Sequence, residues 1–557
     1  MGSRMELREV AVIGGGPGGL LAARLLKLSN PAALVVVYER NPVDATFGFG
    51  VGFSRNTLAA LAAADPAAHS AILSNTVHGS VISFRHNGDQ VSIPGYALDA
   101  ISRATLLSEL ARLATDAGVE VRDRTEVSIA DVEAADVVIA ADGVNSSSRQ
   151  QLAEQLQVDG SVSDTRYMWL GTTAPLEGPT FLFADTEHGL WVMHAYPFTA
   201  GASTAVIEGS SETWAAAGFS DLDARRLAPG DSDLAAMAYL ESVFSEHLGG
   251  HRLLTNNSKW MQFTTIRCGR WSHDNVVFLG DAIHTAHYSL GSGTKLALED
   301  AISLAEALSD AHSLAEGFAR YEASRRPSVE RLQRWAERSE RWWESIGPRL
   351  RMPLSRVALN YLMRTGALGL RDIERDAPEI VEQARRDARR SSEATASLPW
   401  SNEAAGGYLA DIGVQHRDGM CLRQLGHDGG QAQPLQEAEV SVTDSEPAVE
   451  AVRRLSAAQP VGARLTQMPA DLRKADRAVL EPAIAALRDA GAAWITVDCR
   501  NTDREDDRTL PGAEVTDWIR HTADLPAGLL VASADEDTVD AAMLAGRLDY
   551  VVRHAGA

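Results

Sequence analysis

The sequence predicts an α/β protein built around a Rossmann-like nucleotide-binding domain. A short apolar strand, a glycine-rich turn and an amphipathic helix follow one another in residues 8–28, "REVAVIGGGPGGLLAARLLKL". A second apolar strand, "ALVVVYER", comes directly afterwards and completes a βαβ unit. The chain has 557 residues, which exceeds the size at which single hydrophobic cores stop growing, so we expect two or three domains.

The glycine turn carries the pattern Gly14-x-Gly16-x-x-Gly19, between the first strand and the first helix. These glycines permit a tight turn and a close approach of the backbone to a pyrophosphate. Glu39 ends the next strand, where its carboxylate can accept hydrogen bonds from ribose hydroxyls. We therefore predict a dinucleotide site that includes Glu39 and the adjacent Arg40.

The rest of the chain divides by its pattern of strands and helices. Residues 5–163 are expected to form the first part of the nucleotide-binding domain. Short alternating strands such as "TFLFAD" and "GLWVMHAY" predict an inserted, mostly antiparallel substrate-binding sheet over residues 164–265. Residues 266–391 should complete the nucleotide-binding domain and add long helices. A polar, alanine-rich linker is expected at residues 392–407, before a further α/β domain at residues 408–557.

Composition excludes several classes of function. A formal net charge of -23 argues against nucleic acid or an anionic membrane as the partner, because both require a basic footprint. Three scattered cysteines suit neither a disulfide framework nor a four-thiolate zinc site, and we predict no metal. No apolar run approaches the roughly 20 residues that span a bilayer. The expectation is a cytoplasmic protein.

Two further motifs carry a family resemblance. The stretch "ADGVNSSSR" contains Asp142 and Gly143, and "NVVFLGDAIHTAHYSLGSGTKLALEDA" contains Gly280 and Asp281. Together with the first glycine motif, they make residues 8–350 resemble the group A flavin-dependent aromatic monooxygenases, the para-hydroxybenzoate hydroxylase type. The resemblance implies that FAD binds at all three motifs.

The resemblance also assigns individual cofactor contacts. Asp281 would contact the ribityl chain of FAD, and Arg103, in "ISRATLLSEL", would contact the cofactor. The helix that begins near Gly293, just after Gly291, would point its N-terminus at the flavin ring. NADH or NADPH would bind transiently and reduce the flavin. O2 would then add at flavin C4a, and the hydroperoxide would transfer an oxygen atom to an aromatic ring.

Several stretches are similar to one subgroup, the flavin hydroxylases of aryl-coenzyme A thioesters. They include "ATFGFGVGFS" and "TEHGLWVMHAYPF", and Tyr288 and Lys295 stand where many group A enzymes have proline and asparagine. The substrate implied is an aromatic acyl-CoA. Two alternatives stay open: a ring-oxidising oxygenase or dioxygenase acting on a CoA ester in tropone- or tropolone-type biosynthesis, and a catalytically inactive FAD-binding scaffold. A homodimer is a further open expectation.

Histidines and tyrosines are the candidates for the substrate chamber. For each histidine, a hydrogen-bonded structural role is the competing interpretation. A strand that alternates its faces would place His194 and Tyr196 on the same side, so these two rank first. The catalytic candidates are His194, Tyr196, His287 and Tyr288, and the other chamber candidates are His188, as a substrate-binding residue, and His284.

The phosphates of CoA would need local cations. Arg331, Arg334 and Arg338 lie on one face of a predicted helix, with Arg341 one turn further, and could form a phosphate cradle. Glu330 and Glu337 precede Arg334 and Arg341 by four positions, so ordinary ion pairs on the helix surface are the competing interpretation.

The C-terminal part resembles an Old Yellow Enzyme-like barrel. The resemblance lies in "CLRQLGHDGG" and "PAGLLVASADEDTVDAAMLAGRLDYVV". A full (β/α)8 barrel takes about 250 residues, whereas residues 408–557 provide far fewer, and "VDCRNTDREDD" stands where a catalytic loop would be expected. We predict an incomplete (β/α) barrel-like domain that does not bind FMN.

Overall fold

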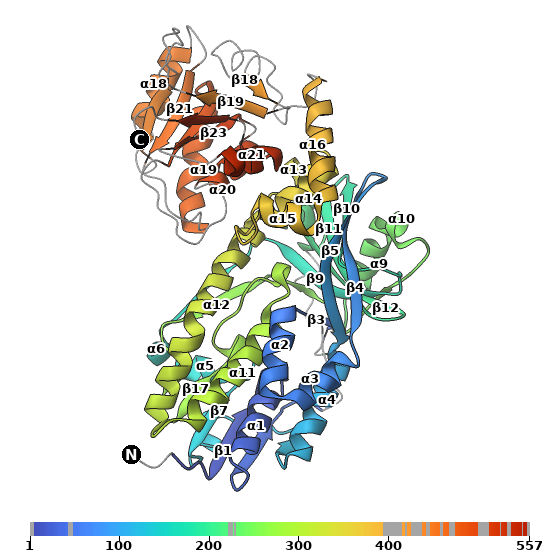
Figure 1. Ribbon diagram of the computed structural model, residues 1–557, viewed down its shortest axis with the longest axis vertical. Coiled ribbons are helices and arrows are strands. Elements are labelled where there is room, and N and C mark those ends of the chain that lie inside the picture. The colour runs from blue at the N-terminus through green and yellow to red at the C-terminus, as the bar shows by residue number, and fades with distance from the viewer. Residues whose placement is uncertain are drawn as a thin grey trace. The chain divides into compact units, whose positions relative to one another are not determined.

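The computed structural model describes most of the chain in two compact units (Figure 1). One unit comprises Met1–Gly88 and Tyr96–Ala336, and the other comprises Asp89–Gly95 and Glu337–Ala557. The described residues are 5–42, 48–220, 227, 230–393, 415–417, 420–424, 437–441, 446–456, 461–466, 474–499, 512–523, 525–531, 536–548 and 550–553.

A six-stranded sheet forms the base of the first unit, in the order β16-β17-β7-β1-β2-β6. All neighbouring strands are parallel except β16 and β17. Apolar residues fill both faces of its central strands, as expected for a parallel sheet covered on both sides. Its strands are β1 (Glu9–Ile13), β2 (Leu34–Tyr38), β6 (Glu120–Arg122), β7 (Val137–Ala140), β16 (Ser272–His273) and β17 (Val276–Phe278).

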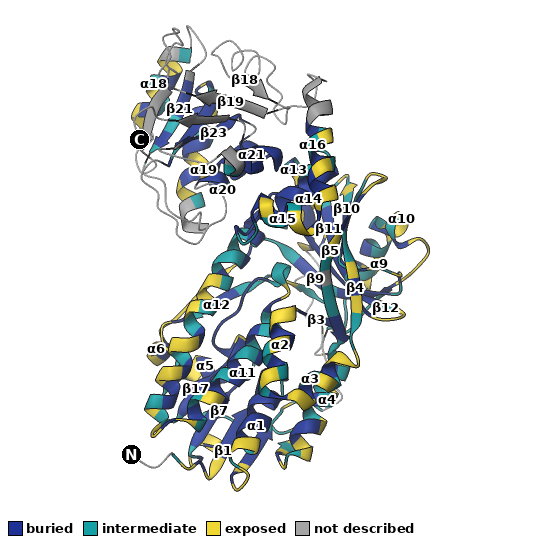
Figure 2. Ribbon diagram, viewed as in Figure 1, coloured by how far each residue is buried: buried dark blue, intermediate teal, exposed yellow. Residues whose placement is uncertain are grey.

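Strand β17 lies beside β7 although more than a hundred residues separate them in the sequence. Much of the second sheet therefore comes from residues that lie in the sequence between two neighbouring strands of the parallel sheet, and the predicted domain bounds stay a prediction. The helices of this domain have dark blue buried faces and yellow exposed faces (Figure 2). They are α1 (Pro17–Ser29), α2 (Arg55–Ala64), α3 (Pro66–Leu73), α4 (Arg103–Asp116), α5 (Ser147–Gln151), α6 (Ala153–Leu156), α11 (Gly293–Ser309) and α12 (Leu314–Glu344), with 3-10 turns η1 (Ile129–Asp131), η2 (Gly280–Ala282) and η3 (Tyr288–Leu290).

Nine strands form the second sheet, in the order β13-β9-β12-β11-β10-β4-β5-β3 with β14 also paired to β9. Three of them, β3 to β5, precede the segment predicted to form this sheet. The strands are β3 (Gly50–Phe53), β4 (Val77–His86), β5 (Asp89–Ser102), β9 (Arg166–Thr172), β10 (Thr180–Thr186), β11 (Gly189–Thr199), β12 (Ala202–Gly209), β13 (Leu253–Leu254) and β14 (Trp260–Met261), and a separate pair joins β8 (Val158–Val162) to β15 (Thr264–Cys268).

One face of the second sheet is the core of this part of the unit. Met168, Trp191, Met193 and Ile207 are fully buried there. They belong to a cluster that also takes in residues of α7 (Ser211–Ala216), α9 (Leu234–Val243) and α10 (Ser245–Leu248). Because side chains alternate along a strand, the residues between them must project from the opposite face.

The second unit contains a seven-stranded sheet, in the order β18-β19-β24-β23-β22-β21-β20. Strands β20 to β24 are parallel and adjacent in chain order, and β24 also lies beside β19. The resemblance of this unit to an Old Yellow Enzyme-like barrel stays a prediction. The strands are β18 (Gln415–Arg417), β19 (Met420–Gln424), β20 (Glu437–Ser441), β21 (Val461–Thr466), β22 (Ala492–Asp498), β23 (Ala527–Val531) and β24 (Tyr550–Arg553).

Helices surround this sheet and also form a separate group after α12. Most of the predicted linker, the end of "CLRQLGHDGG" and most of "VDCRNTDREDD" lie outside the described residues. The helices are α13 (Ile346–Arg349), α14 (Leu354–Met363), α15 (Leu370–Asp376), α16 (Pro378–Glu393), α18 (Glu446–Ser456), α19 (Lys474–Asp489), α20 (Ala513–Thr522) and α21 (Glu536–Leu544).

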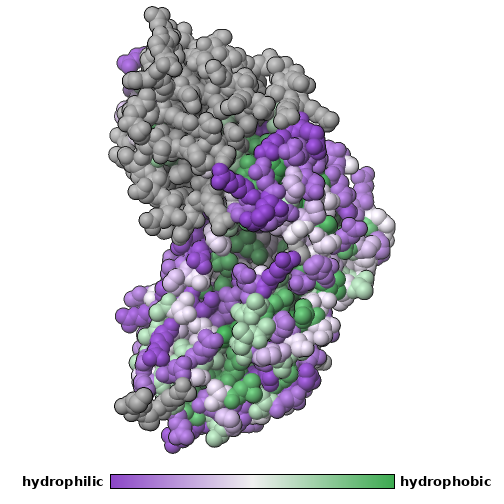
Figure 3. All heavy atoms as spheres, in the orientation of Figure 1, coloured by the Kyte–Doolittle hydropathy of each residue, from purple (hydrophilic) through white to green (hydrophobic). Residues whose placement is uncertain are grey.

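Hydrophilic and hydrophobic residues are interspersed over the visible face of the first unit (Figure 3). Among the described residues, no helix is both long enough and apolar enough to cross a bilayer. The same part of the chain contains no group of three or more His, Cys, Asp or Glu residues that could hold a metal ion.

Candidate active site

The first glycine turn follows β1 and begins α1. Gly14 has φ of +107°, and a Cβ there would lie 2.3 Å from the Ala141 carbonyl oxygen. A Cβ on Gly19 would lie 2.2 Å from the Gly14 carbonyl oxygen. Both positions therefore require glycine for packing and backbone geometry. A Cβ on Gly16, in contrast, would have no described atom within 4 Å, so this glycine faces open space.

That open space lies at a helix N-terminus suited to an anion. No side chain caps the first turn of α1, and Pro17 occupies its first position. Glu39 follows β2, and its carboxylate accepts hydrogen bonds from the Gly15 and Asn41 amides, each at 2.8 Å. Arg40 is exposed beside it. The predicted pyrophosphate and ribose positions are thus adjacent in the fold.

Arg149 connects the second motif to the third. Its guanidinium donates hydrogen bonds to the carbonyl oxygens of Asp281 and Ala282, at 3.3 and 2.9 Å. Asp142 orders the loop before Arg149 by accepting a hydrogen bond from the Ser146 hydroxyl at 2.6 Å. Gly143 has φ of +80°, which allows the chain to turn between them.

A buried charge cluster fixes the third motif from behind. Asp300, on α11, accepts hydrogen bonds from the Gly280 amide at 3.0 Å and from Arg325 Nε at 2.8 Å. His284 Nε2 lies 2.7 Å from the same carboxylate. His284 was a candidate for the substrate chamber. Its contact with Asp300 instead gives it the other role considered for each histidine, that of a hydrogen-bonded structural residue. Gly280 itself has φ of +59° and turns the chain from β17 into this cluster.

Asp281 lies next to this cluster, and the charges of His284 and Asp300 act on it. Its side chain is solvent-accessible, and burial among surrounding protein atoms raises its carboxyl pKa, partly offset by His284, Arg103 and Arg149. Burial lowers the pKa of Arg103, and Asp281 and Tyr196 counteract that effect. Arg103 and Asp281, predicted to contact the same cofactor, are therefore electrostatic neighbours.

The start of α11 forms one boundary of this region. Gly291 has φ of +60°, and Gly293 is the first residue of the helix. A Cβ on Gly293 would lie 3.7 Å from Asp281 Oδ1. No side chain caps the first turn of α11, and Lys295 lies in that turn. Asp281 is thus held close to an uncapped helix N-terminus, and its predicted contact with the ribityl chain stays a prediction.

The second sheet turns a polar and aromatic face away from its core. Cross-strand partners project from the same side of a sheet. His194 is opposite Phe181 and Val206, Tyr196 is opposite Thr204, and Glu208 is opposite Tyr167. The prediction that His194 and Tyr196 share a face is confirmed, because both lie opposite residues of that same face.

Glu208 is the centre of a buried cluster on this face. Its carboxylate lies 3.1 Å from His194 Nε2, and it accepts a hydrogen bond from the Tyr288 hydroxyl. Only 3% of Glu208 is exposed. Burial by itself raises the pKa of Glu208, but His194, His287 and Tyr288 together bring the pKa below its ordinary value. The carboxylate is therefore ionised at neutral pH.

His287 lies beside this cluster and is 2% exposed. Burial lowers its pKa from 6.5 to about 3, with His194 acting in the same direction and Glu208 opposing the shift. Its Nδ1 accepts a hydrogen bond from the Ser289 amide, which leaves the proton of the neutral ring on Nε2. At neutral pH, His287 is thus an uncharged donor at Nε2.

Aromatic rings enclose Tyr288. The centroid of its ring lies 4.1 Å from that of His287, 4.6 Å from Tyr167, 6.0 Å from Phe263 and 6.2 Å from Trp169. The pKa of Tyr167 is raised to about 12, by burial and by the charge of Asp281. Tyr167 therefore connects the surroundings of Asp281 with those of Glu208.

Tyr196 has a defined partner of its own. Its hydroxyl donates a hydrogen bond to the Gly50 carbonyl oxygen at 2.8 Å, and the Gly50 amide donates to the Thr204 hydroxyl. The preceding carbonyl, that of Phe49, accepts from the Arg103 amide. Burial raises the pKa of Tyr196, so the phenol is a hydrogen-bond donor that holds β3 against the sheet next to Arg103.

The remaining substrate-binding candidates lie elsewhere. His188 is in the turn between β10 and β11, about 20 Å from His194 along the strand direction, and its ring is near Tyr239. Arg331 lies over the Trp335 ring, and Arg334 is half-buried on the same helix. Arg338 belongs to the second unit, where it pairs with Glu514. These contacts give the four residues surroundings other than the Glu208 cluster.

Glu208 is the residue that sequence reasoning missed. The stretch "STAVIEG" reads as a strand, and Thr204, Val206 and Glu208 share one of its faces. An acidic side chain between apolar residues, on a strand with both faces covered, is the signal that could have identified it.

The fold and this site define a flavoprotein. Gly16 leaves open space at the N-terminus of α1, with Glu39 beside the same turn, and Arg103 and Asp281 are neighbours at the third motif. These residues fit FAD. The model of the FAD binding domain family matches residues 8–336, and the chain belongs to that family.

Similar proteins are monooxygenases of aromatic compounds. Salicyloyl-CoA 5-hydroxylase from Streptomyces sp is 42% identical over 371 residues, which cover 65% of this chain and 72% of the relative. The 3-hydroxy-4-methyl-anthranilyl-[aryl-carrier protein] 5-monooxygenase of Streptosporangium sibiricum is 34% identical over 375 residues, covering 67% and 99%. The chain is therefore a FAD-dependent monooxygenase, and its aromatic-hydroxylase relatives confirm the predicted class.

Proposed function

We propose that the chain hydroxylates the aromatic ring of an acyl-CoA thioester and consumes O2 and NADH or NADPH. Two relatives support this proposal, because the names of both specify an aryl group attached to a carrier. The observation that carries it is the buried contact of Glu208 with His194 and Tyr288, on the polar face of the second sheet.

The chain's own residues first position the cofactor. Gly14, Gly16 and Gly19 would admit the pyrophosphate at the N-terminus of α1, and Asp281 and Arg103 would contact the flavin part. Bound FAD supplies the transfer of electrons from a reduced nicotinamide to O2 and the delivery of one oxygen atom to an electron-rich ring.

Tyr288 then acts on the substrate. Its O–H donates to the ionised Glu208, and a phenol oxygen that donates can also accept a hydrogen bond, here from a ring hydroxyl or amino group. A proton accepted there can be shared with Glu208 and with His194 Nε2. Withdrawal of that proton increases the electron density of the ring and hence its nucleophilicity.

Aromatic neighbours limit the contact of Tyr288 with water. The rings of Tyr167, Trp169, Phe263 and His287 pack near its ring, and a bound substrate would cover the part that stays exposed. His287 is neutral over the whole range near pH 7, so it adds no positive charge beside Glu208. The negative charge of Glu208 is therefore available to Tyr288.

The substrate class is tested by NADH and NADPH oxidation under air with the FAD-loaded protein. Benzoate, salicylate and anthranilate would be compared with their CoA thioesters, and each product would be analysed by mass spectrometry. We expect stimulation by thioesters alone, with a product heavier by one oxygen atom. Equal stimulation by the free acids would refute the CoA assignment, and addition of two oxygen atoms would favour a ring-oxidising reaction.

The role of Tyr288 is tested by Tyr288→Phe, which removes only the hydroxyl. We expect retained FAD and a fall in hydroxylation of about 100-fold or more, within the range of general acid-base catalysis. Tyr239→Phe is the matched control, because Tyr239 packs against Trp191 on the core face of the sheet. Equal turnover by the two variants would exclude the proposed proton path.

A further inference from the structure

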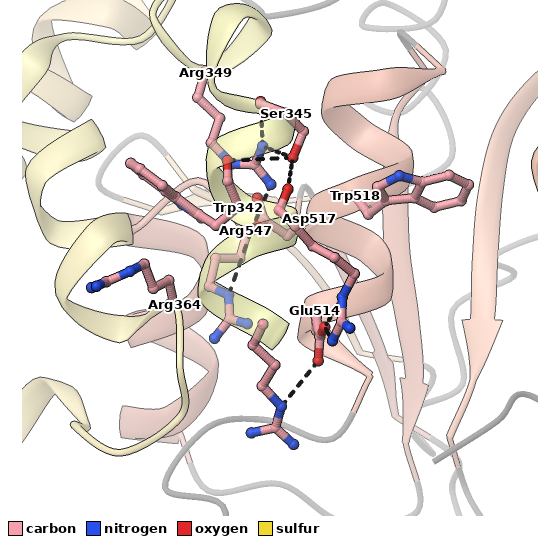
Figure 4. Close-up of a pocket in the computed structure, with 10 residues that line it drawn as sticks. Trp342, Ser345, Arg349, Arg364, Glu514, Asp517, Trp518 and Arg547 are labelled. Atoms are coloured by element: carbon pink, nitrogen blue, oxygen red, sulfur yellow. Dashed lines mark hydrogen bonds and ion pairs between the residues drawn. The ribbon is translucent and has the colours of Figure 1, made fainter. Parts of the chain in front are cut away.

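A charged pocket lies within the second unit, and none of its lining residues belongs to the proposed active site. Its closed interior is about 20 Å³ and the space with its opening to solvent is about 290 Å³, between α12, α13, α14 and α20 (Figure 4). Its lining contains two tryptophans, Trp342 and Trp518. Its charged lining consists of Arg338, Arg341, Arg349, Arg364 and Arg547 with the carboxylates of Glu514 and Asp517.

These arginines are buried to an unusual degree. Arg349 is 2% exposed and Arg547 is 3% exposed, and Arg341 and Arg364 are also buried. A guanidinium remains charged in a protein, so its removal from water must be offset by partners inside. The number of negatively charged partners determines whether the charges that line the pocket are balanced.

Four of the arginines share two carboxylates. Arg338 Nε lies 3.2 Å from Glu514 Oε2, and Arg341 Nε donates to Glu514 Oε1 at 2.9 Å. Dashed lines in Figure 4 join Arg349 and Arg547 to Asp517, at 3.0 and 4.0 Å.

Arg364 is held in another way. It donates from Nε to the Ser339 hydroxyl at 2.8 Å and from one terminal nitrogen to the Tyr361 carbonyl oxygen at 2.7 Å, and it lies over the Tyr361 ring. The charged groups that line the pocket therefore carry a formal excess of three positive charges. In a chain with a net charge of -23, this is a strong local reversal of sign.

The pKa of a histidine in the same unit, His521, is lowered in these surroundings. His521 is buried, with Nε2 3.4 Å from Asp517 Oδ1. Burial depresses its pKa, and the charges of Arg349, Arg520 and Arg356 lower the pKa further.

We propose that this pocket is a binding site for a phosphate group. A phosphate monoester or inorganic phosphate presents tetrahedral oxygens and up to two negative charges, which match several guanidinium donors and reduce the positive excess. Because the closed interior holds little more than a water molecule, a phosphate group would occupy the open mouth of the pocket. The pocket includes Arg338 and Arg341 of the CoA phosphate cradle predicted along α12, but Arg331 and Arg334 do not line it.

The test uses the full-length, FAD-saturated protein. Thermal unfolding, followed by tryptophan emission, would be measured against inorganic phosphate, against AMP and against chloride at matched ionic strength. We expect a saturable rise in Tm with phosphate that chloride does not reproduce. An equal response to AMP would identify phosphate esters as ligands, and a response to inorganic phosphate alone would identify the free ion. No rise beyond that in chloride would overturn the proposal.

Two variants assign the effect to this pocket. Arg547→Met keeps the aliphatic stem, removes one charge and should weaken phosphate binding roughly tenfold. Arg385→Met is the control, since Arg385 pairs with Glu374 and Glu382 at the surface of the same unit. Unchanged phosphate affinity in Arg547→Met would refute the assignment.

A variant that removes a negative charge from the lining keeps the test decisive if Arg547→Met folds poorly. Glu514→Gln removes a negative charge from the lining and should tighten phosphate binding. Equilibrium dialysis of labelled phosphate with the unmodified protein gives a direct measurement that depends on no variant. Failure to bind labelled phosphate saturably would overturn the proposal, whatever the outcome for the monooxygenase reaction.

Discussion

His287 makes a stability prediction that acidification can test. The folded chain keeps this buried imidazole neutral down to its lowered pKa of about 3, whereas the ordinary pKa is 6.5. Between these values the unfolded chain binds a proton that the folded chain does not. The free energy of unfolding must therefore decrease as pH falls through this window. Above pH 6.5 the ring is neutral in both states, and no stability is lost.

The size of the effect follows from the shift. Each pH unit within the window costs about 1.4 kcal/mol, so acidification from pH 6.5 to pH 5 should remove about 2 kcal/mol from the free energy of unfolding. His287→Gln keeps a neutral polar side chain of similar size but does not titrate. The difference between the two proteins isolates the contribution of His287 from that of other groups.

The assay is urea unfolding at pH 7 and pH 5, with excess FAD and with flavin fluorescence as the signal, because release of the cofactor reports on the first unit. The loss of stability between the two pH values should be about 2 kcal/mol larger in the unmodified protein than in His287→Gln. Equal losses in both proteins would refute the inference that His287 is buried in its neutral form.

Three further changes separate structural from functional residues. Asp300→Asn removes the carboxylate that holds Arg325 and should lower the free energy of unfolding by about 3–5 kcal/mol, measured by urea unfolding; a loss below about 1 kcal/mol would contradict the buried cluster. Gly16→Ala should fold but bind FAD poorly, since only the cofactor would meet the new methyl group; Gly201→Ala, equally open, should remain yellow. His188→Ala should leave the KM for the aromatic substrate unchanged, and a large increase would return His188 to the substrate site.

The nucleotide-binding part could be predicted because its constraints are local. Gly14 and Gly19 allow close backbone packing that any side chain would prevent. The strands that flank them are short, continuous apolar runs, typical of a parallel sheet. The alternation of side chains along β11 is likewise a local property, and it sets His194 and Tyr196 on one face.

The catalytic cluster could not be predicted in the same way, because the sheet register assembles it. Glu208 meets Tyr288, a residue eighty positions away in the sequence. His284 looked equally suited to chemistry, but its partner Asp300 is set by the packing of α11. The partner of Arg338, Glu514, lies in a different part of the chain, whereas sequence spacing suggested only local ion pairs.

The central claim is that the chain places one oxygen atom from O2 on the ring of a carrier-bound aromatic acid. The most direct measurement is a single turnover of the reduced, FAD-loaded protein with an aryl-CoA thioester under ¹⁸O2, followed by mass spectrometry of the ring and the thioester. The account predicts one ¹⁸O atom on the ring and an intact thioester. A product without the label, or with both labelled atoms, would contradict it.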